Sequence, residues 1–301
     1  MKAADLAKHW GTKPDFVPRL PKWLSPKLDG YRSMTHGGLV LGSNGEPIVN
    51  QFTQSLFRDH SFLDGELVVG PPNASNALSA TQSGMKRRDG EPDVHLYVFD
   101  CFRNPEDSYR NRLEAAHLAV VQAKRADPRL VGRLHILPQL PVSTLGEVLE
   151  RETEYLAQGY EGIMLRSPHG QYKFGRSSPT EDDLWKLKRF MDGEAVVTAV
   201  EEAEENTNEA TEDAFGRTKR SSAKAGKVGK GMVGTIIAQD PEWGELRLSP
   251  GTMPHSERLS LWSDGRRGRT LVGLTVHWRA FGYGVKEKPR FARYYGVRLD
   301  V

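Results

Sequence analysis

A six-residue stretch, Lys27-Leu28-Asp29-Gly30-Tyr31-Arg32, constrains this chain more than any other segment. It places an amine, a carboxylate and a guanidinium around a glycine, which permits a tight turn. A lysine amine attacks phosphorus only when unprotonated, and a desolvated, cation-flanked pocket makes that state accessible near neutral pH. The Arg32 guanidinium suits phosphate or ribose oxygens. The stretch predicts a reactive lysine near a turn, with a charged surface turn as the alternative.

Two later segments carry acidic residues inside apolar strand patterns. Residues 62–69 (FLDGELVV) predict a buried strand interrupted by Asp64-Gly65-Glu66, and residues 160–166 (YEGIMLR) predict another with Glu161 near its start. Buried carboxylates are costly unless they are paired or bind metal. A turn between two short strands is the alternative reading of the first segment.

A third segment, residues 184–190 (LWKLKRF), predicts a strand in which two lysines alternate with apolar residues. Alternation places the ammonium groups of Lys186 and Lys188 on one face and directs Trp185 and Leu187 to the core. Two cations on one face require an anion or water. In an isolated strand water would suffice, but beside a reactive lysine we expect a phosphate.

The other segments before residue 190 predict a mixture of helices and strands. A hairpin is expected around Gly37-Gly38, and a further strand at Leu96–Asp100. Residues 70–93, rich in Pro, Asn, Ser and Gly, are expected to form a mobile loop with a basic cluster at 86–88. Helices are predicted at residues 51–59, at 108–126, and from the capping box at Thr144 to Gly159.

The character changes after residue 190, where five short strands are predicted in about a hundred residues. Such a series favours a small, partly closed barrel of the OB-fold type. We therefore expect an α+β chain with one domain at 1–189 and an all-β domain at 190–301. The predicted strands are 194–203, 232–239, 245–248, 271–281 and 291–299.

Between the first two of these strands lies an insert of unusual charge. Residues 201–213 are rich in Glu and Asp, whereas residues 215–230 carry only basic charges. Length, polarity and Gly/Ser content predict disorder in the free protein. A solvated charge run is one reading, and we favour the other, a basic arm that becomes ordered on a polyanion.

Composition excludes several classes of protein. The chain has 301 residues, a net charge of +3 and one cysteine, Cys101, so an internal disulfide framework and a thiolate zinc cluster are excluded. It contains no P-loop motif and no HExxH motif. Without a long apolar run or a leader-like start, we expect an intracellular, reducing location in the cytoplasm or an infected host cell. Nucleic-acid affinity must come from local basic clusters.

The order of these segments resembles the covalent nucleotidyltransferases, and most closely the small ATP-dependent DNA ligases of viral and phage type. The resemblance rests on KLDGYR, FLDGELVV, LYVFDCF, YEGIMLR, LWKLKRF and a final KPRFARYYGVR, in that order. It implies a nucleotidyltransferase (adenylation) domain of antiparallel sheets and helices at 1–189, followed by an OB-fold at 190–301. The insert FGRTKRSSAKAGKVGKGMVG is similar to a latch that grips nicked duplex, here at about 203–231.

The resemblance also implies the chemistry of the first domain. Lys27 would be the nucleophile that becomes linked to AMP from ATP. Three carboxylates, Asp29, Glu66 and Glu161, would arrange Mg²⁺ or Mn²⁺ or contact ribose. Arg32 would contact the sugar of ATP, and Phe99 would stack on adenine. The α-phosphate would be held by Lys186 and Lys188, and the pyrophosphate by Arg290 and Arg298.

The implied substrate is nicked duplex DNA, and we expect a monomer. Arg32 would also hold the nick phosphate. The other predicted DNA contacts are basic side chains of the insert and of the loop at 172–176: Arg217, Lys219, Arg220, Lys224, Lys227, Lys173 and Arg176.

One position departs from the family. Relatives usually carry Ser-Arg-x-Gly between the first two motifs, with the arginine on the 5′-phosphate of the nick, whereas this chain has Gly42-Ser43-Asn44-Gly45. A serine hydroxyl cannot make that bidentate, charge-assisted contact. Self-adenylation is therefore better supported than sealing. An RNA ligase, a GTP-using capping enzyme and a non-catalytic end-binding module remain alternatives.

Overall fold

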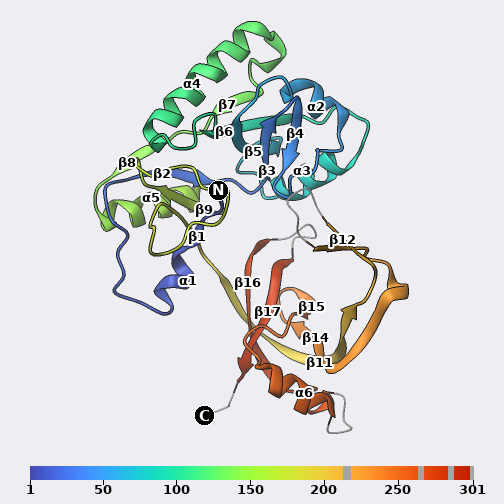
Figure 1. Cartoon of the computed structure of the whole chain (residues 1–301). Helices are drawn as coiled ribbons and strands as arrows, with labels where there is room; N and C mark the ends of the chain where they lie inside the picture. The colour runs from blue at the N-terminus through green and yellow to red at the C-terminus, as the bar shows by residue number, and fades with distance from the viewer. Residues whose placement is uncertain (213–217, 264–267, 284–287, 299–301) are drawn as a thin grey trace. The chain divides into compact units, whose positions relative to one another are not determined.

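The computed structural model describes residues 1–212, 218–263, 268–283 and 288–298 (Figure 1). The chain divides into two compact units, Met1–Arg189 and Phe190–Val301. Helices and largely antiparallel sheets occur together in the first unit, and strands dominate the second. The predicted α+β class is confirmed. No helix among the described residues is long and apolar enough to cross a membrane.

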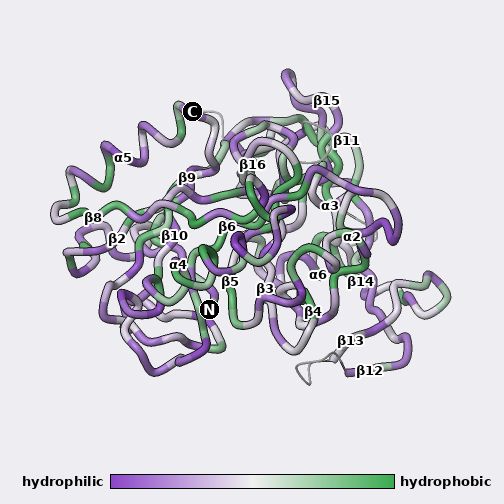
Figure 2. The backbone as a smooth tube through the Cα atoms, turned by 90° about the horizontal axis from the view of Figure 1, so that it is seen from above, coloured by the Kyte–Doolittle hydropathy of each residue, from purple (hydrophilic) through white to green (hydrophobic). Residues whose placement is uncertain are grey.

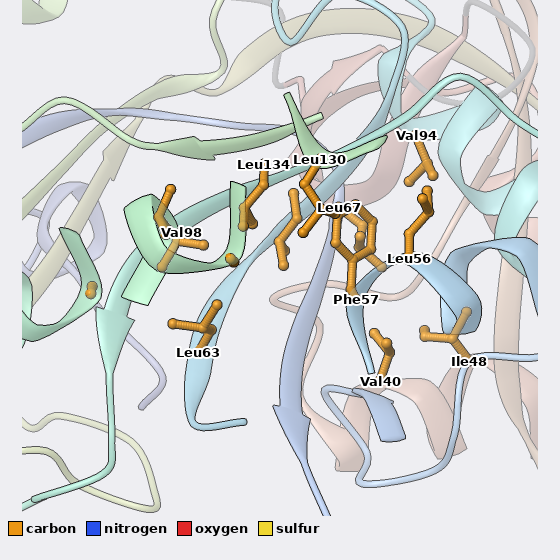
Figure 3. Packing of buried hydrophobic residues seen from close by; sticks show 14 of the residues in the cluster. Val40, Ile48, Leu56, Phe57, Leu63, Leu67, Val94, Val98, Leu130 and Leu134 are labelled. Carbon is orange, nitrogen blue, oxygen red and sulfur yellow. The ribbon is translucent and has the colours of Figure 1, made fainter. Parts of the chain in front are cut away.

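One five-stranded sheet of the first unit has the order β4-β3-β5-β6-β7. Its core face packs on three helices, and Leu67 lies close to Leu56 and Phe57 in the same buried cluster as Leu63 (Figure 3). Because side chains alternate along a strand, the opposite face of the sheet receives Asp64 and Glu66. The elements are β3 (Tyr31–His36), β4 (Leu39–Gly42), β5 (Leu63–Val69), β6 (Val94–Cys101), β7 (Leu134–Ile136), α2 (Gln51–Phe57), α3 (Ala77–Lys86), α4 (Tyr109–Ala126) and η1 (Pro128–Leu130).

A second five-stranded sheet has the order β1-β10-β9-β2-β8. Its core is built around Trp185, Leu187 and Ile163, and Val148 from α5 packs into it. Figure 2 shows hydrophobic and hydrophilic residues alternating along α5, the pattern of a helix with one face buried. The elements are β1 (Ala4–Asp5), α1 (Leu6–Trp10), β2 (Lys22–Lys27), β8 (Leu140–Val142), α5 (Leu145–Ala157), β9 (Gly162–Arg166) and β10 (Leu184–Lys188).

The predicted helices of this unit form where their caps indicate. The Ser108 hydroxyl accepts a hydrogen bond from the Asn111 amide at the start of α4, and Thr144 accepts one from Glu147 at the start of α5. The expected mobile loop at 70–93 is wrong over much of its length, because α3 occupies Ala77–Lys86. Ala77, Thr81 and Met85 recur at helical spacing and are buried.

The second unit contains a five-stranded sheet of order β15-β14-β11-β16-β17. One parallel bridge joins Ser249, which follows β15, to Arg293 of β17, so the two edges of the sheet approach each other without forming a closed barrel. The predicted strand at 271–281 begins later than expected, because a 3₁₀ turn precedes it. The elements are β11 (Met191–Asn206), β14 (Lys227–Asp240), β15 (Gly244–Leu248), α6 (His255–Ser263), η3 (Arg269–Leu271), β16 (Thr275–Tyr283) and β17 (Pro289–Val297).

The charged insert is more regular than the sequence predicts. β11 and β14 continue as a ladder out to the pair Asn206 and Lys227, and β12 (Ala210–Glu212) pairs with β13 (Thr218–Arg220). A 3₁₀ turn, η2 (Lys224–Gly226), leads into β14. The expectation of disorder is therefore wrong for the described part of the insert. Antiparallel pairing sets the acidic run against the basic run, so cross-strand charges such as Glu204 and Lys227 attract one another.

Candidate active site

The lysine predicted as nucleophile lies where three strands of the second sheet end together. β2 and β10 both pair with β9, and their registers place Lys27 and Lys188 on either side of Gly162. A Cβ at residue 162 would lie 2.2 Å from the Leu187 carbonyl oxygen, and the backbone φ there is +149°. Only glycine permits this approach. Strand register thus brings together two lysines that lie far apart in the sequence.

Glu161 lies between these two lysines. Its Oε1 accepts a hydrogen bond from Lys188 Nζ at 2.9 Å, and its Oε2 accepts one from Lys27 Nζ. Burial alone would raise the pKa of Glu161, but the two ammonium groups outweigh it and lower the pKa to about 2. The Glu161 carboxylate is therefore ionised and shared by both lysines.

The same contact sets the charge of Lys27. Burial lowers the pKa of the Lys27 amine, but the attraction of Glu161 is stronger, so the pKa is raised above its ordinary value. The cation-flanked amine expected from the sequence is present and half-buried, but here its carboxylate partner keeps it protonated. Attack on phosphorus requires that this ion pair loosens.

The turn after Lys27 depends on a second close approach. A Cβ at Gly30 would lie 2.3 Å from the Leu67 carbonyl oxygen and 2.9 Å from Glu66 Cγ. Glycine at this position therefore lets the chain pass directly over β5 as it leaves β2. This path brings Asp29 and the start of β3 next to the carboxylates of β5.

Arg32 is held by a carboxylate that the sequence did not assign to it. The Arg32 guanidinium donates to Asp64 through Nε at 3.0 Å and through Nη2 at 2.7 Å. The Tyr172 hydroxyl donates to the same carboxylate at 2.7 Å, and Asp64 is fully buried. The acidic strand residue is thus paired, as its burial requires. The sequence signal for this arrangement was the alternation of side chains along the strand, which places Asp64 and Glu66 on the same face.

Glu66 faces the site from the same side of β5. Burial raises the pKa of its carboxyl to about 7, although Lys27 and Arg32 both act to lower it. The Glu66 side chain is only half-buried and lines the cavity beside Lys27, so a bound cation can reach it. Among the described residues, no three carboxylate, imidazole or thiol groups are grouped as a ready metal site.

A cavity of about 330 Å³ opens beside Lys27. This volume lies within the range of small-molecule sites. One part of its lining is apolar and includes Phe99, the residue expected from the sequence to contact the nucleotide base. The apolar lining residues are Met1, Ala3, Pro26, Leu28, Phe99, Leu137, Met164 and Leu184, and the charged ones are Lys2, Lys27, Arg32, Glu66, Arg166, Arg176 and Lys186.

The two predicted phosphate lysines occupy different positions. Lys186 lines the cavity and pairs with Asp5 of β1 at 3.2 Å, whereas Lys188 pairs with Glu161. Ser43 also lines the cavity, so the position without the expected arginine does face this site.

Sequence reasoning missed Arg166, which lines the cavity as the last residue of β9. Its guanidinium lies 4.4 Å from the ring centre of Tyr109 and 5.5 Å from that of Phe99, and it pairs with the fully buried Asp100. The available signal in the sequence was an arginine at the end of the YEGIMLR strand.

The predicted DNA contacts are dispersed. Arg176 lines the cavity, and Lys173 pairs with Glu181 in an exposed ion pair. In the insert, Lys224 is exposed and Lys227 lies 3.3 Å from Glu204. Arg220 donates to the carbonyl of Asn208. Arg217 lies outside the described residues, and the side chain of Lys219 is also outside them.

The two predicted pyrophosphate contacts belong to the second unit. The Arg290 guanidinium lies 5.2 Å from the ring centre of Phe291, and Arg298 pairs with Glu194. Their roles remain predictions.

Comparison with known proteins supports the resemblance. A family model described as the ATP dependent DNA ligase domain matches residues 20–188. The DNA ligase of African swine fever virus (isolate Tick/Malawi/Lil 20-1/1983) is 27% identical over 136 residues, 45% of this chain. The match spans 31% of that viral protein, about a third of its length.

Two solved structures share the fold across nearly the whole chain. A Lig E DNA ligase, from a study of DNA binding with a minimal scaffold, is 24% identical with a TM-score of 0.70. The match covers 99% of this chain and 98% of that ligase. The Chlorella virus DNA ligase-adenylate is 23% identical with a TM-score of 0.51 and the same coverage of both chains. At these identities the likeness establishes the fold.

Proposed function

Because this chain belongs to the ATP-dependent DNA ligase family, we propose that it seals nicks in duplex DNA through a lysyl-AMP intermediate on Lys27. The observation that carries the proposal is the position of Lys27 in a cavity with an apolar wall and several cationic groups. The apolar wall suits the adenosine moiety of ATP, and the cationic groups suit its triphosphate.

In the first step, the Lys27 amine attacks the α-phosphorus of ATP. The amine gives its proton to solvent water, a bond forms between Nζ and phosphorus, and the bond to the pyrophosphate oxygen breaks. The incoming phosphates are anions that compete with Glu161 for Lys27 and Lys188. ATP binding therefore helps to release the nucleophile from its carboxylate partner. In-line attack then depends mainly on positioning.

Different residues of the cavity would bind the base and the phosphates of ATP. Phe99 and the neighbouring apolar side chains would pack on adenine, and Lys186, which lies on the same strand as Lys188, would contact the α-phosphate. Arg32, fixed by Asp64, would hold the ribose. The Arg290 and Arg298 side chains would orient pyrophosphate.

A divalent cation, Mg²⁺ or Mn²⁺, would neutralise charge on the reacting phosphates when bound. Glu66 fits such a cation, because its carboxylate lines the Lys27 cavity and is only half-buried. Asp29 lies in the turn beside it. Glu161 already has two ammonium partners, so it would become available to a cation only after the lysines engage phosphate.

In the second step, AMP passes to the 5′-phosphate of a nick, and in the third the adjacent 3′-hydroxyl displaces AMP. The basic side chains of the insert and of the loop at 172–176 would hold the duplex, and the protein would act as a monomer.

A labelling experiment tests the proposal. The protein is incubated with α-labelled ATP and Mg²⁺ and resolved on a denaturing gel. We expect a labelled protein band that disappears in Lys27→Ala and persists in the surface control Lys86→Ala. Label that survives in Lys27→Ala would contradict the assigned nucleophile.

The same experiment separates the competing functions. Labelling by GTP in preference to ATP would indicate a capping enzyme. Transfer of the label from the protein to nicked RNA, but not to nicked DNA, would indicate an RNA ligase. Nick binding without any labelled protein would indicate a non-catalytic end-binding module.

A further inference from the structure

The loop at 172–176 presents an aromatic side chain that the proposed chemistry does not use. Phe174 is 72% exposed, the highest value among the exposed large hydrophobic side chains of the described residues. Leaving a phenyl ring in water forgoes burial of a large apolar surface. Phe174 lies two residues before Arg176, which lines the Lys27 cavity, so this exposed ring is a candidate contact for a ligand of that cavity.

The loop that carries Phe174 is firmly attached to the first unit. The Tyr172 amide donates to the Pro105 carbonyl at 2.8 Å, and the Tyr172 hydroxyl donates to Asp64. On the other side of Phe174, the carbonyl of Gly175 accepts a hydrogen bond from the Lys2 amide at 2.6 Å. The chain is thus fixed on both sides of the ring, which reduces the entropy cost when the ring makes a contact.

The ring itself is supported from one side only. Its centre lies 5.0 Å from that of Tyr172 and 6.1 Å from that of Phe102, both in edge-to-face geometry. Tyr172 in turn bonds the Asp64 carboxylate that positions Arg32. The exposed ring is therefore connected through packed side chains to the site around Lys27.

Cationic groups flank the ring along the chain. Arg176, two residues later, lines the Lys27 cavity, and no ion pair of its side chain is found among the described residues. Lys173 precedes the ring and pairs with Glu181, which lies outside this loop. Aromatic side chains interleaved with cations are typical of surfaces that bind nucleic acid, where rings pack on nucleotides and cations meet phosphates.

We propose that Phe174 packs against the face of a DNA nucleotide next to the nick, while Arg176 contacts a backbone phosphate. This inference rests on the proposed function, because it takes nicked duplex DNA as the substrate. A single ring flanked by charges fits a nucleotide better than a protein partner, which would require a wider apolar patch.

Binding of a fluorescently labelled nicked duplex, measured over a series of salt concentrations, tests the proposal. Phe174→Ala should weaken binding about ten-fold, in the range expected for removal of one aromatic–nucleotide contact. The slope of log affinity against log salt should stay unchanged, because every phosphate contact is kept. Arg176→Ala should flatten that slope by roughly 0.9. Phe174→Trp should bind like the wild type, as should Val131→Ala, a control at another exposed apolar residue.

Labelling by ATP, which needs no DNA, distinguishes the possible failures. A wild-type protein that neither accepts AMP nor binds nicked DNA would refute the proposed function itself. If the wild type does both and Phe174→Ala accepts AMP normally, unchanged DNA affinity in that variant overturns the role of the ring. A loss of self-association in Phe174→Ala, seen by sedimentation with DNA affinity intact, would overturn it as well and indicate a second copy as the partner.

Discussion

The Lys27 amine donates a hydrogen bond to Glu161 Oε2, so the proposed nucleophile is held as an ammonium ion by a carboxylate beside it. The second oxygen of the same carboxylate binds Lys188. One acidic side chain thus pairs both with the proposed nucleophile and with a lysine that we propose contacts phosphate. Its competition with incoming phosphates couples nucleotide binding to release of the amine.

Glu161→Gln should shift the pH dependence of self-adenylation to lower pH. Glu161 raises the pKa of Lys27 and burial lowers it, so removing the carboxylate charge lowers the pKa. A larger fraction of Lys27 is then neutral at a given pH below the new pKa. We expect the acidic limb of the rate–pH profile to move to lower pH, even if the maximal rate falls. Initial rates of label incorporation across the neutral range measure this shift.

Glu181→Gln is the matched control for this prediction. It also removes the carboxylate of a lysine ion pair, but Glu181 pairs with Lys173 and does not line the cavity. Its profile should coincide with that of the wild type. An acidic limb that stays in place in Glu161→Gln would mean that the carboxylate does not set the protonation of Lys27.

Gly162→Ala should destabilise the protein and reduce self-adenylation. The new Cβ would meet the Leu187 carbonyl oxygen, and the positive φ would strain any side chain. We expect a loss of about 2–4 kcal/mol in the free energy of unfolding, measured in urea. Gly146→Ala is the control, since residue 146 lies in α5 with only an ordinary contact at 3.8 Å. It should be neutral or slightly stabilising, because alanine favours helix. Equal effects of the two substitutions would rule out the special constraint at residue 162.

The sequence predicts the chemical groups of the site better than their partners. Alternation in the LWKLKRF strand places Lys186 and Lys188 on one face, and the cavity does contain Lys186 and Phe99. The sequence does not predict that Glu161 is shared by two lysines, because this sharing depends on the register of three strands. Register between distant strands is a tertiary property and leaves little trace in local pattern.

In the fold, too, local features were predicted from the sequence and features that depend on tertiary packing were missed. Helix caps at Ser108 and Thr144 are local signals, and both helices form as predicted. The helix at Ala77–Lys86 was missed because its polar composition suggests a loop, whereas its three buried residues need the surface of the β-sheet to pack against. The insert was expected to be disordered from its composition alone. Its regular pairing arises because the acidic and basic runs lie opposite each other in one ladder.

Ser43→Arg should improve the sealing of a nick that already carries AMP. Ser43 lines the cavity and is exposed, so an arginine there can reach a phosphate without burying a charge. A charge-assisted hydrogen bond contributes about 1.5–3 kcal/mol, which corresponds to a gain of about ten-fold or more in sealing rate under single-turnover conditions. Asn44→Arg adds the same charge one residue away, outside the cavity lining, and should change little. Equal gains in both variants would indicate general attraction of DNA.

Shortening the basic insert should weaken binding to nicked duplex and flatten its salt dependence. Asn206 and Lys227 are paired across β11 and β14, so residues 207–226 can be replaced by a two-glycine turn without breaking the ladder below them. For every DNA phosphate that the shortened protein no longer binds, the log–log salt slope should fall by roughly 0.9. A charge variant, Arg220→Gln with Lys224→Gln, keeps the length of the insert and tests its cations alone. We expect this variant to flatten the slope by a smaller amount, and ATP labelling should be normal in both variants. DNA affinity and salt slope equal to those of the wild type would show that the insert is a solvated charged hairpin with no part in gripping DNA.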